Sequence, residues 1–469
     1  MEGTVDLVEY TQAGNGGAYM SYWKLTVEQF GKIKHAEIDL APFTLFVGDN
    51  NSGKSYLLSL AWAMRTIARD TVFSEEAIRE LKSEAFDKIE RQVFQSVDMV
   101  EAGSEVSFEI SEILPEIQCV INELLIANKQ VLVKTLFNSD SVKVGNIILT
   151  MPDNVTGRIR IVREGEKCII SYQESSATFS NLWGTEKKKD LLVRKKFLGR
   201  MFIVWLIAKL LNAAPGNKRM IYLPAARTGF MLTKDIINKF ARKKTYDVEV
   251  EIEDKSETQP FSRPIIEFLD VINELSEEQK GNEKYQRLVH FIQNKMVQGN
   301  VEIAALAGKE LSYIPYGQDK HYPFRTTSAV VTELSPLLLL LEHQKDMVGL
   351  FYEEPEMCLH PALQKRMGQV LIRLVNAGID VTTTTHSDII LQHINNMIRL
   401  KTMNGRLEDY GYEVSDLITK DKMRVYQLLN CNDGITEVSE LSCGENGFAI
   451  PTFNDALDYM MDETIQLQS

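Results

Sequence analysis

The sequence predicts an α/β fold with a mixed sheet built around a phosphate-binding loop, and three stretches point to it. The continuously apolar run Phe43–Gly48 leads into the loop Gly48–Ser55, GDNNSGKS, and then into residues with helical spacing. A second apolar stretch, VGLFYEE, ends in carboxylates at Glu353 and Glu354, and a third, IDVTTTTH, ends at His386. Apolar strands that alternate with helices are typical of a largely parallel sheet.

The loop fits the pattern G-x-x-x-x-G-K-[ST], in which backbone N–H groups surround phosphates. Gly48 and Gly53 permit positive φ and close approach to a ligand. Lys54 is expected to reach the outer phosphates, and the Ser55 hydroxyl is expected to ligate Mg²⁺. A glycine-rich surface turn is the competing interpretation, but the strand before the loop and the helix after it favour a nucleotide site. The remaining expected cofactor-binding residues are Asn50, Asn51 and Ser52.

The paired carboxylates are expected to complete this site. Mg²⁺ bound to phosphates needs a carboxylate or its water network, and hydrolysis needs a second carboxylate that orients water. We assign Glu353 to the metal and Glu354 to the water, although the first residue is more often Asp. His386 is expected to hydrogen-bond the γ-phosphate. An acidic turn and a structural histidine are the alternatives.

Bulk properties restrict the class of protein. A chain of 469 residues is long enough for a large core with insertions or for two lobes. The net charge of −13 argues against binding nucleic acid by bulk electrostatics, although a local basic groove stays possible. Five scattered cysteines fit reduced thiols, and the apolar runs fall short of a membrane span. We therefore expect a soluble cytoplasmic protein that is not bound to a membrane.

The pattern of apolar and polar residues along the chain predicts where its strands and helices lie. Strands are expected at Leu25–Val47, helices at about Tyr56–Val97 and over most of Phe230–Val297, and a β-rich insertion after Glu105. A closing strand pair and a final helix are expected at the C-terminal end. The predicted divisions are 1–20 as a flexible leader, 21–100 as the first part of the nucleotide-binding head, 101–215 as an insertion of mixed strands and helices, and 216–469 as the rest of the head.

Three motifs in this order, GDNNSGKS, FYEEPEMCLHP and TTTTHSD, resemble the ABC-type ATPase heads of the SMC and OLD (overcoming lysogenization defect) families. The resemblance covers Leu25–Ser59 and about Tyr222–Phe453, and it leaves Glu105–Lys209 unmatched. It implies an ABC-type P-loop ATPase head that hydrolyses ATP with Mg²⁺. It also implies a homodimer, or a higher homo-oligomer, with ATP held between the heads of two subunits.

Such heads carry a signature segment that contacts the γ-phosphate of the opposite subunit from a helix N-terminus. The best candidate is RTTSAVVTELSPLLLLLEH, in which Thr327 or Ser328 is expected to cap the helix. It lacks the Ser-Gly-Gly-Gln of transporter ATPases. In YLPAARTG, Arg227 is the second candidate to approach the phosphates or to relay to a partner, with a surface arginine as the alternative.

Three functions follow from the resemblance. The first is a sensor or switch ATPase of a bacterial anti-phage defence module that controls a separately encoded effector, such as a nuclease, as in two-gene systems of the PARIS and Septu type. The second is an SMC-like DNA-repair ATPase that binds DNA directly, although no sustained heptad run predicts its coiled coil. The third is an ATP-gated nuclease, although no second acidic metal cluster is recognisable. We favour the first.

Overall fold

The computed structural model describes most of the chain, and all structural statements below concern these residues. They are 22–165, 167–173, 175–179, 188–211, 220–246, 260–275, 283–303, 311–344, 347–403, 407–444, 447–449 and 461–467. The expected leader 1–20 and most of the expected last helix lie outside them.

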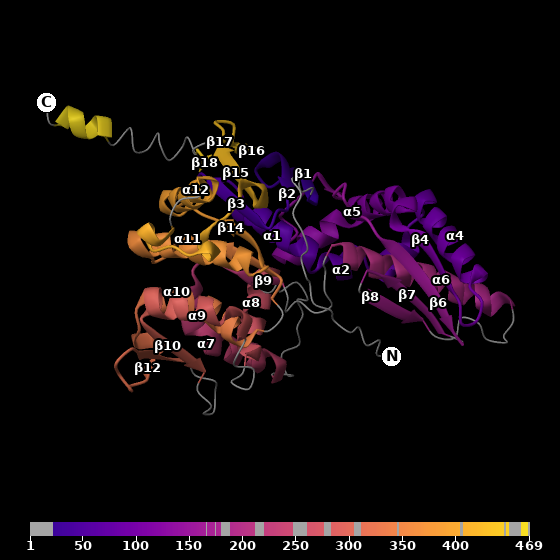
Figure 1. Cartoon of the computed structure of the whole chain (residues 1–469), viewed down its shortest axis with the longest axis horizontal. Helices are drawn as coiled ribbons and strands as arrows, with labels where there is room; N and C mark the ends of the chain where they lie inside the picture. The colour runs from indigo at the N-terminus through magenta and orange to yellow at the C-terminus, as the bar shows by residue number, and fades with distance from the viewer. Residues whose placement is uncertain are drawn as a thin grey trace. The chain divides into compact units, whose positions relative to one another are not determined.

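The chain divides into two compact units. The first contains Met1–Glu28, Ala63–Val133 and Lys143–Pro215, and the second contains Gln29–Trp62, Lys134–Val142 and Gly216–Ser469. Figure 1 labels the helices and strands of both.

The second unit is organised around a mixed sheet with the strand order β2-β16-β15-β3-β14-β13-β9. Its central strands β15, β3, β14, β13 and β9 run parallel, whereas β15 and β16 are antiparallel. The strands are β2 (Ile33–Asp39), β3 (Phe43–Gly48), β9 (Met220–Leu223), β13 (Gly349–Glu353), β14 (Asp380–Thr384), β15 (Met423–Asn430) and β16 (Thr436–Glu440). Every residue of β3, β9 and β13 is buried, as the continuously apolar sequences predict.

Helices follow the parallel strands of this unit. Helix α1 starts at Lys54, directly after the loop that leaves β3, and α11 packs against both α12 and β14 (Figure 1). The helices are α1 (Lys54–Arg65), α7 (Arg227–Tyr246), α8 (Arg263–Glu274), α9 (Gln286–Ile292), α10 (Ala329–His343), α11 (Pro361–Asn376) and α12 (Asp388–Thr402). The helical pattern expected in Phe230–Val297 is confirmed by α7, α8 and α9 and by a π-helical turn at Gln293–Val297.

A small antiparallel sheet accompanies these helices, with the order β10-β11-β12. Its strands are β10 (Gly299–Ile303), β11 (Leu311–Pro315) and β12 (Tyr322–Pro323). Sequence patterns alone did not predict it. A two-stranded ribbon, β17 (Cys443–Gly444) with β18 (Gly447–Phe448), packs on α12.

The first unit contains a four-stranded antiparallel sheet, β4-β6-β7-β8. Helix α4 packs against both β4 and α6, and β1 pairs with β5. The elements are β1 (Lys24–Phe30), α2 (Ala68–Thr71), α3 (Glu75–Glu80), α4 (Glu84–Met99), β4 (Glu105–Glu109), α5 (Leu114–Phe137), β5 (Asn146–Thr150), β6 (Arg158–Glu164), β7 (Lys167–Tyr172), β8 (Ser175–Phe179) and α6 (Lys188–Leu210).

The largest difference from expectation is α5, a 24-residue helix in a region expected to be rich in strands. Its apolar residues are spread around the helix, so they give a weak amphipathic signal. Tertiary contacts help to fix it: Gln118 and Asn122 on α5 bond the backbone of β5 at Leu149, with Gln118 Nε2 donating to the carbonyl and the Leu149 N–H donating to Asn122 Oδ1 at 2.9 Å. No helix among the described residues combines the length and the apolar character needed to cross a bilayer.

A buried histidine lies between α11 and α12. His393 is 3% exposed, and neither ring nitrogen has a hydrogen-bond partner among the described residues. Burial lowers its pKa from 6.5 to about 4, and the charge of Lys365 acts in the same direction. The folded protein therefore holds this imidazole neutral where the unfolded chain would protonate it.

We expect this histidine to contribute to acid unfolding. Stability associated with neutral His393 is complete above pH 6.5 and is lost as the pH falls from 6.5 to about 4, because the unfolded state binds the proton first. His393→Leu should reduce this loss by up to about 3 kcal/mol, as urea unfolding at a series of pH values would measure. His35→Gln, at an exposed histidine of β2, is the control, and an unchanged pH dependence in His393→Leu would contradict the prediction.

Candidate nucleotide-binding site

The three sequence motifs meet at one edge of the sheet in the second unit. Strands β3, β14 and β13 are parallel neighbours, and their register pairs Phe46 with Thr384 and Thr384 with Glu353. The loop after β3, the carboxylates after β13 and His386 after β14 therefore leave the sheet at the same level. Carboxyl ends of parallel strands are where ligands bind in open α/β sheets.

The phosphate loop is braced by β15. The φ of Gly48 is 123°, and a Cβ placed there would lie 2.1 Å from the carbonyl oxygen of Leu428, so glycine is required. Asp49 donates its N–H to that carbonyl at 3.1 Å. Asn430 then donates its N–H to Asp49 Oδ2 and its side-chain amide to the carbonyl of Asn50, both at 2.9 Å.

Lys54 is folded back onto the loop that it follows. Its Nζ donates to the carbonyl of Gly48 at 3.1 Å and to that of Asp49 at 2.5 Å, and the residue is 6% exposed. Burial lowers the pKa of this ammonium, whereas the charges of Glu354, Asp49 and Glu356 oppose the shift. A phosphate would offer the ammonium stronger acceptors than these two carbonyls.

The other expected loop residues differ in exposure. Asn50, Asn51 and Ser55 are exposed, and Asn51 has a φ of 57°. Ser52 is fully buried, and its hydroxyl has no hydrogen-bond partner among the described residues. Gly53 has a φ of 94°, and its carbonyl accepts from the N–H of Leu57 at 3.1 Å, which closes the first turn of α1.

Glu353 is held from the neighbouring strand β9. Its Oε2 accepts from the N–H of Ala225 at 2.8 Å, and the carboxylate also accepts from the hydroxyl of Tyr222. The hydroxyl oxygen of Tyr222 in turn lies 3.0 Å from the hydroxyl oxygen of Ser59 on α1. Glu353 as a residue is 9% exposed, and these hydrogen bonds hold its carboxylate beside the helix that carries Lys54.

Glu354 occupies a strained turn at the end of β13. Its φ is 40°, which non-glycine residues rarely adopt. Its N–H donates to the carbonyl of Thr384 at 3.1 Å and contacts the Thr384 hydroxyl at 3.2 Å. Burial raises the pKa of this carboxyl, and the charge of Glu353 raises it further. His386 Nε2 lies 3.8 Å from Glu354 Oε1, so the two expected catalytic side chains are close together.

Glu356 is a functional candidate that sequence reasoning missed. Its Oε1 accepts from the N–H of His386 at 2.6 Å, and burial raises its pKa. This bond links the turn after β13 to the turn that carries the histidine. The repeated acid in EEPE is the signal in the sequence, but three acids within four residues do not reveal which side chain is buried.

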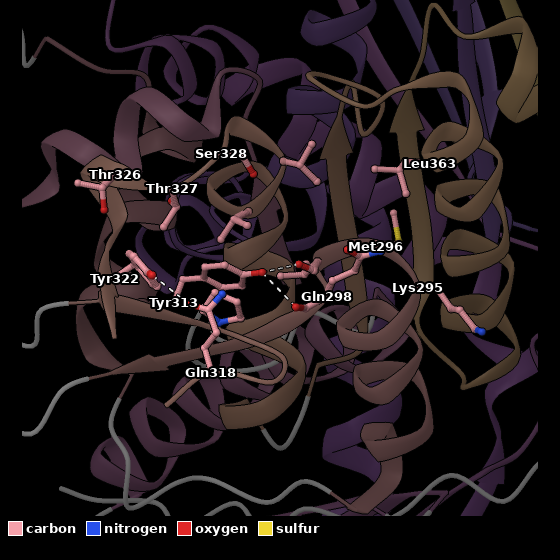
Figure 2. A pocket seen from close by; sticks show the side chains of 14 residues that line it. Lys295, Met296, Gln298, Tyr313, Gln318, Tyr322, Thr326, Thr327, Ser328 and Leu363 are labelled. Atoms are coloured by element: carbon pink, nitrogen blue, oxygen red, sulfur yellow. Dashed lines mark hydrogen bonds between the residues drawn. The ribbon is translucent and has the colours of Figure 1, made fainter. Parts of the chain in front are cut away.

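Ser328 lies at the N-terminus of α10, as expected, but it does not cap the helix with its side chain. Among the described residues its hydroxyl makes no capping hydrogen bond, while Thr327 Oγ1 donates to the carbonyl of Phe324 at 2.8 Å. Ser328 and Thr327 border a cavity of about 560 Å³ (Figure 2). On another wall, Tyr313 Oη donates to the carbonyl of Val297 at 2.8 Å.

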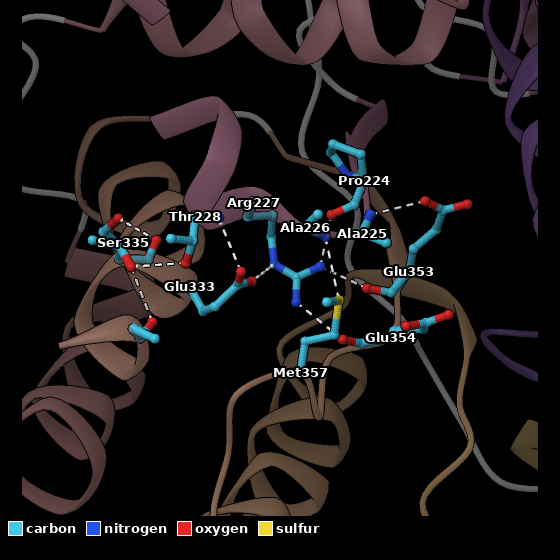
Figure 3. Close-up of polar contacts among 12 residues, drawn as sticks. Pro224, Ala225, Ala226, Arg227, Thr228, Glu333, Ser335, Glu353, Glu354 and Met357 are labelled. Carbon is cyan, nitrogen blue, oxygen red and sulfur yellow. Dashed lines mark hydrogen bonds and ion pairs between the residues drawn. The ribbon is translucent and has the colours of Figure 1, made fainter. Parts of the chain in front are cut away.

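Arg227 is buried beside the turn that carries the two carboxylates. The residue is 0% exposed, which also excludes a surface arginine. Its guanidinium is enclosed by protein acceptors, between Glu333 on one side and the backbone of Glu353 and Glu354 on the other (Figure 3). In this structure the donors of Arg227 are directed at the protein itself, and the expected approach to the phosphates or relay to a partner stays a prediction.

Comparisons with known proteins agree with a nucleotide-binding chain. The family described as the AAA ATPase domain matches residues 20–391. No curated protein sequence matches the chain.

Solved structures of SMC heads resemble the chain at low identity. An SMC head bound to the C-terminal winged-helix domain of ScpA is 14% identical, covers 90% of this chain and 98% of its own, and has a TM-score of 0.35. The SMC head from Thermotoga maritima is 12% identical over 89% of this chain and 98% of its own, with a TM-score of 0.33. The SMC head from Pyrococcus furiosus, with an extended coiled coil and bound to the C-terminal domain of ScpA, is 16% identical. The match covers 96% of this chain and 100% of that chain, with a TM-score of 0.33. Similarity at this level does not bear on activity.

Replacing the loop lysine should abolish nucleotide binding. Lys54→Met keeps a long apolar stem but removes the ammonium, which is the loop cation placed to meet the outer phosphates. We expect no ATP binding by titration calorimetry and an unchanged circular dichroism spectrum. Lys365→Met, at an exposed lysine of α11, is the control. Equal ATP affinity in Lys54→Met would show that the loop is not the phosphate site.

Proposed function

The chain belongs to the AAA ATPase domain family, and from this premise we propose that it binds ATP at Gly48–Ser55 and hydrolyses it. The observation that carries the proposal is the meeting of three groups at one sheet edge: Lys54 in the loop, Glu354 after β13 and His386 after β14. Their charges act on one another, since Glu354 and Lys54 each shift the other's pKa and Lys54 shifts that of His386.

The proposed binding roles follow from position. The loop N–H groups from Asn50 to Ser55 and the N-terminus of α1 hold the phosphates. The residues present fit Mg²⁺, because Ser55 offers an exposed hydroxyl and Glu353 a carboxylate, and hard cations prefer oxygen ligands. When bound, Mg²⁺ neutralises charge on the phosphate oxygens.

The proposed chemistry is the orientation of water by Glu354. Its carboxylate is partly exposed, so water can reach it, and its backbone is fixed by Thr384. Burial lowers the pKa of His386, which keeps its imidazole neutral near pH 7. A neutral imidazole can donate one hydrogen bond to a γ-phosphate while its backbone N–H stays bonded to Glu356.

We extend the proposal to assembly. Ser328 heads α10 with a hydroxyl that is not used as a cap within the described residues, which supports a contact from this helix end to a nucleotide on a second subunit. Two heads would then close on two ATP molecules as a homodimer. Closure driven by ATP is a switch only when the nucleotide binds the closed state more tightly than the open one.

The biological role that we favour is a sensor or switch subunit of a bacterial anti-phage defence module, which controls a separately encoded effector such as a nuclease. The nucleotide site is the one recognisable chemistry among the described residues, where no group of three or more His, Cys, Asp or Glu side chains is arranged to hold a metal. The output of such a switch would lie in another protein.

Glu354→Gln should separate binding from hydrolysis. The amide keeps the size of the side chain but is not a base, so ATP should still bind while turnover falls at least ~100-fold. His386→Ala should also slow turnover, with little change in ADP affinity. Phosphate release and calorimetry measure the two steps, and Glu408→Gln, at an exposed acid, serves as control. Loss of ATP binding in Glu354→Gln, with turnover otherwise normal per bound ATP, would reverse the roles given to Glu353 and Glu354.

Purification from the native operon tests the switch. We expect mass spectrometry to find a stable complex with the product of a neighbouring gene, in amounts that differ between the unmodified protein and Glu354→Gln. Purification alone in both states, together with phage resistance in cells that express this protein alone, would refute the effector model. DNA binding with a steep salt dependence would instead favour the DNA-repair role.

A further inference from the structure

Arg227 is placed to hold the turn that carries the two carboxylates. It is the first residue of α7, which begins after the three-residue connection from β9, and it is 0% exposed. One terminal nitrogen, Nη1, donates to the carbonyl of Pro224 at 2.7 Å and to that of Glu353 at 2.6 Å. The other, Nη2, donates to the carbonyl of Glu354 at 3.0 Å. A planar guanidinium can make these bonds at fixed angles, which a lysine cannot reproduce.

The turn at Glu354 needs this support. Glu354 has a φ of 40°, so its backbone would relax to a commoner conformation if its contacts were removed. Thr384 on β14 holds the N–H of Glu354 from one side. Arg227 holds the carbonyl of the same residue from the other side, and also packs its guanidinium over the ring of Tyr352 at 4.7 Å. The direction of the Glu354 side chain therefore depends on Arg227.

Glu333 connects this arrangement to α10. Its Oε2 lies 2.9 Å from Arg227 Nε as an ion pair, and it is 2% exposed. Its Oε1 accepts from the N–H of Thr228 at 2.9 Å, and the hydroxyls of Thr228 and Thr332 lie 2.8 Å apart (Figure 3). Glu333 is five residues after Ser328, in the first turns of α10. A shift of this helix end would therefore move the carboxylate that anchors Arg227.

Stability alone does not require charged groups here. Two buried charges lose much of their hydration, and apolar residues of similar size often stabilise a protein equally well. What the pair adds is direction: one carboxylate orients a guanidinium, which orients two backbone carbonyls.

We propose that Arg227 is a positioning residue for ATP hydrolysis, and that Glu333 makes its position depend on the N-terminal turns of α10. This inference rests on the proposed ATPase activity. Arg227 acts on the direction of Glu354 and contacts no nucleotide, so ATP binding at Gly48–Ser55 proceeds without it. The chain thereby ties the end of α10 that bears Ser328 to the water-orienting carboxylate through the ion pair of Glu333 with Arg227 and the bonds of Arg227 to the backbone carbonyls of Glu353 and Glu354.

The test compares two buried ion pairs of the second unit. Arg227→Met/Glu333→Gln removes both charges together and keeps an acceptor for the N–H of Thr228. The matched control is Arg373→Met/Asp416→Asn. Arg373 Nε lies 2.6 Å from Asp416 Oδ1, and its guanidinium packs over Phe291 at 4.2 Å, so the control also loses a buried pair and a cation–π contact. Thermal unfolding, ATP affinity, kcat and KM are measured for each.

We expect Arg227→Met/Glu333→Gln to bind ATP as the unmodified protein does while kcat falls by up to about 100-fold, because small misplacements of a reacting group have effects on that scale. The control pair should lose thermal stability to a similar degree with unchanged kcat. Arg227→Lys, which keeps the buried charge, should fold normally and recover part of kcat, and it decides the question if the double variant does not fold.

Three results would overturn the inference. Unchanged kcat in Arg227→Met/Glu333→Gln, or in Arg227→Lys where that variant decides, shows that the pair is merely structural. A parallel loss of ATP affinity and kcat shows that Arg227 supports the whole binding site. Absence of ATP hydrolysis by the unmodified protein overturns the proposed function, and this inference with it, whereas hydrolysis unaffected by the variants overturns the inference alone.

Discussion

The register of three parallel strands is the constraint on which the rest of the site depends. Hydrogen bonding pairs Phe46 of β3 with Thr384 of β14, and Thr384 with Glu353 of β13. Residues more than 300 positions apart in sequence therefore end their strands side by side. A slip of one residue in either pairing would turn alternate side chains to the opposite face of the sheet. The phosphate loop, the carboxylates and the histidine then could not act on one ligand.

Burial at this sheet edge shifts the pKa values of its charged and titratable side chains. Burial raises the pKa of Glu354 and lowers those of Lys54 and His386, so each group is less charged than it would be in water. The opposite charges of Lys54 and Glu354 partly compensate each other. Such mutual dependence is common at functional sites, where groups of opposite charge meet in a partly dry cleft.

Side chains from several elements also hold the backbone at this sheet edge. Arg227 bonds the backbone of both carboxylates, Glu356 bonds the N–H of His386, and Asn430 bonds the loop at Asp49. Each connects one strand end to another element. The positive φ of Glu354 costs about 1–3 kcal/mol. The bonds from Arg227 and Thr384 to the backbone of Glu354 offset that cost and hold the turn.

Short patterns in the sequence were enough to predict the loop Gly48–Ser55, the paired carboxylates, the histidine at a strand end and the α/β class, because glycine, apolar periodicity and a lysine at fixed spacing act over a few residues. The sequence did not reveal α5, the small sheet β10-β11-β12 or the burial of Arg227. From sequence alone an arginine is expected on the surface unless its hydrogen-bond acceptors are known. The acceptors of Arg227 at Glu333, Glu353 and Glu354 lie more than 100 residues away in the chain. Tertiary structure decided these features, since a buried charge is stable only where distant segments supply its partners.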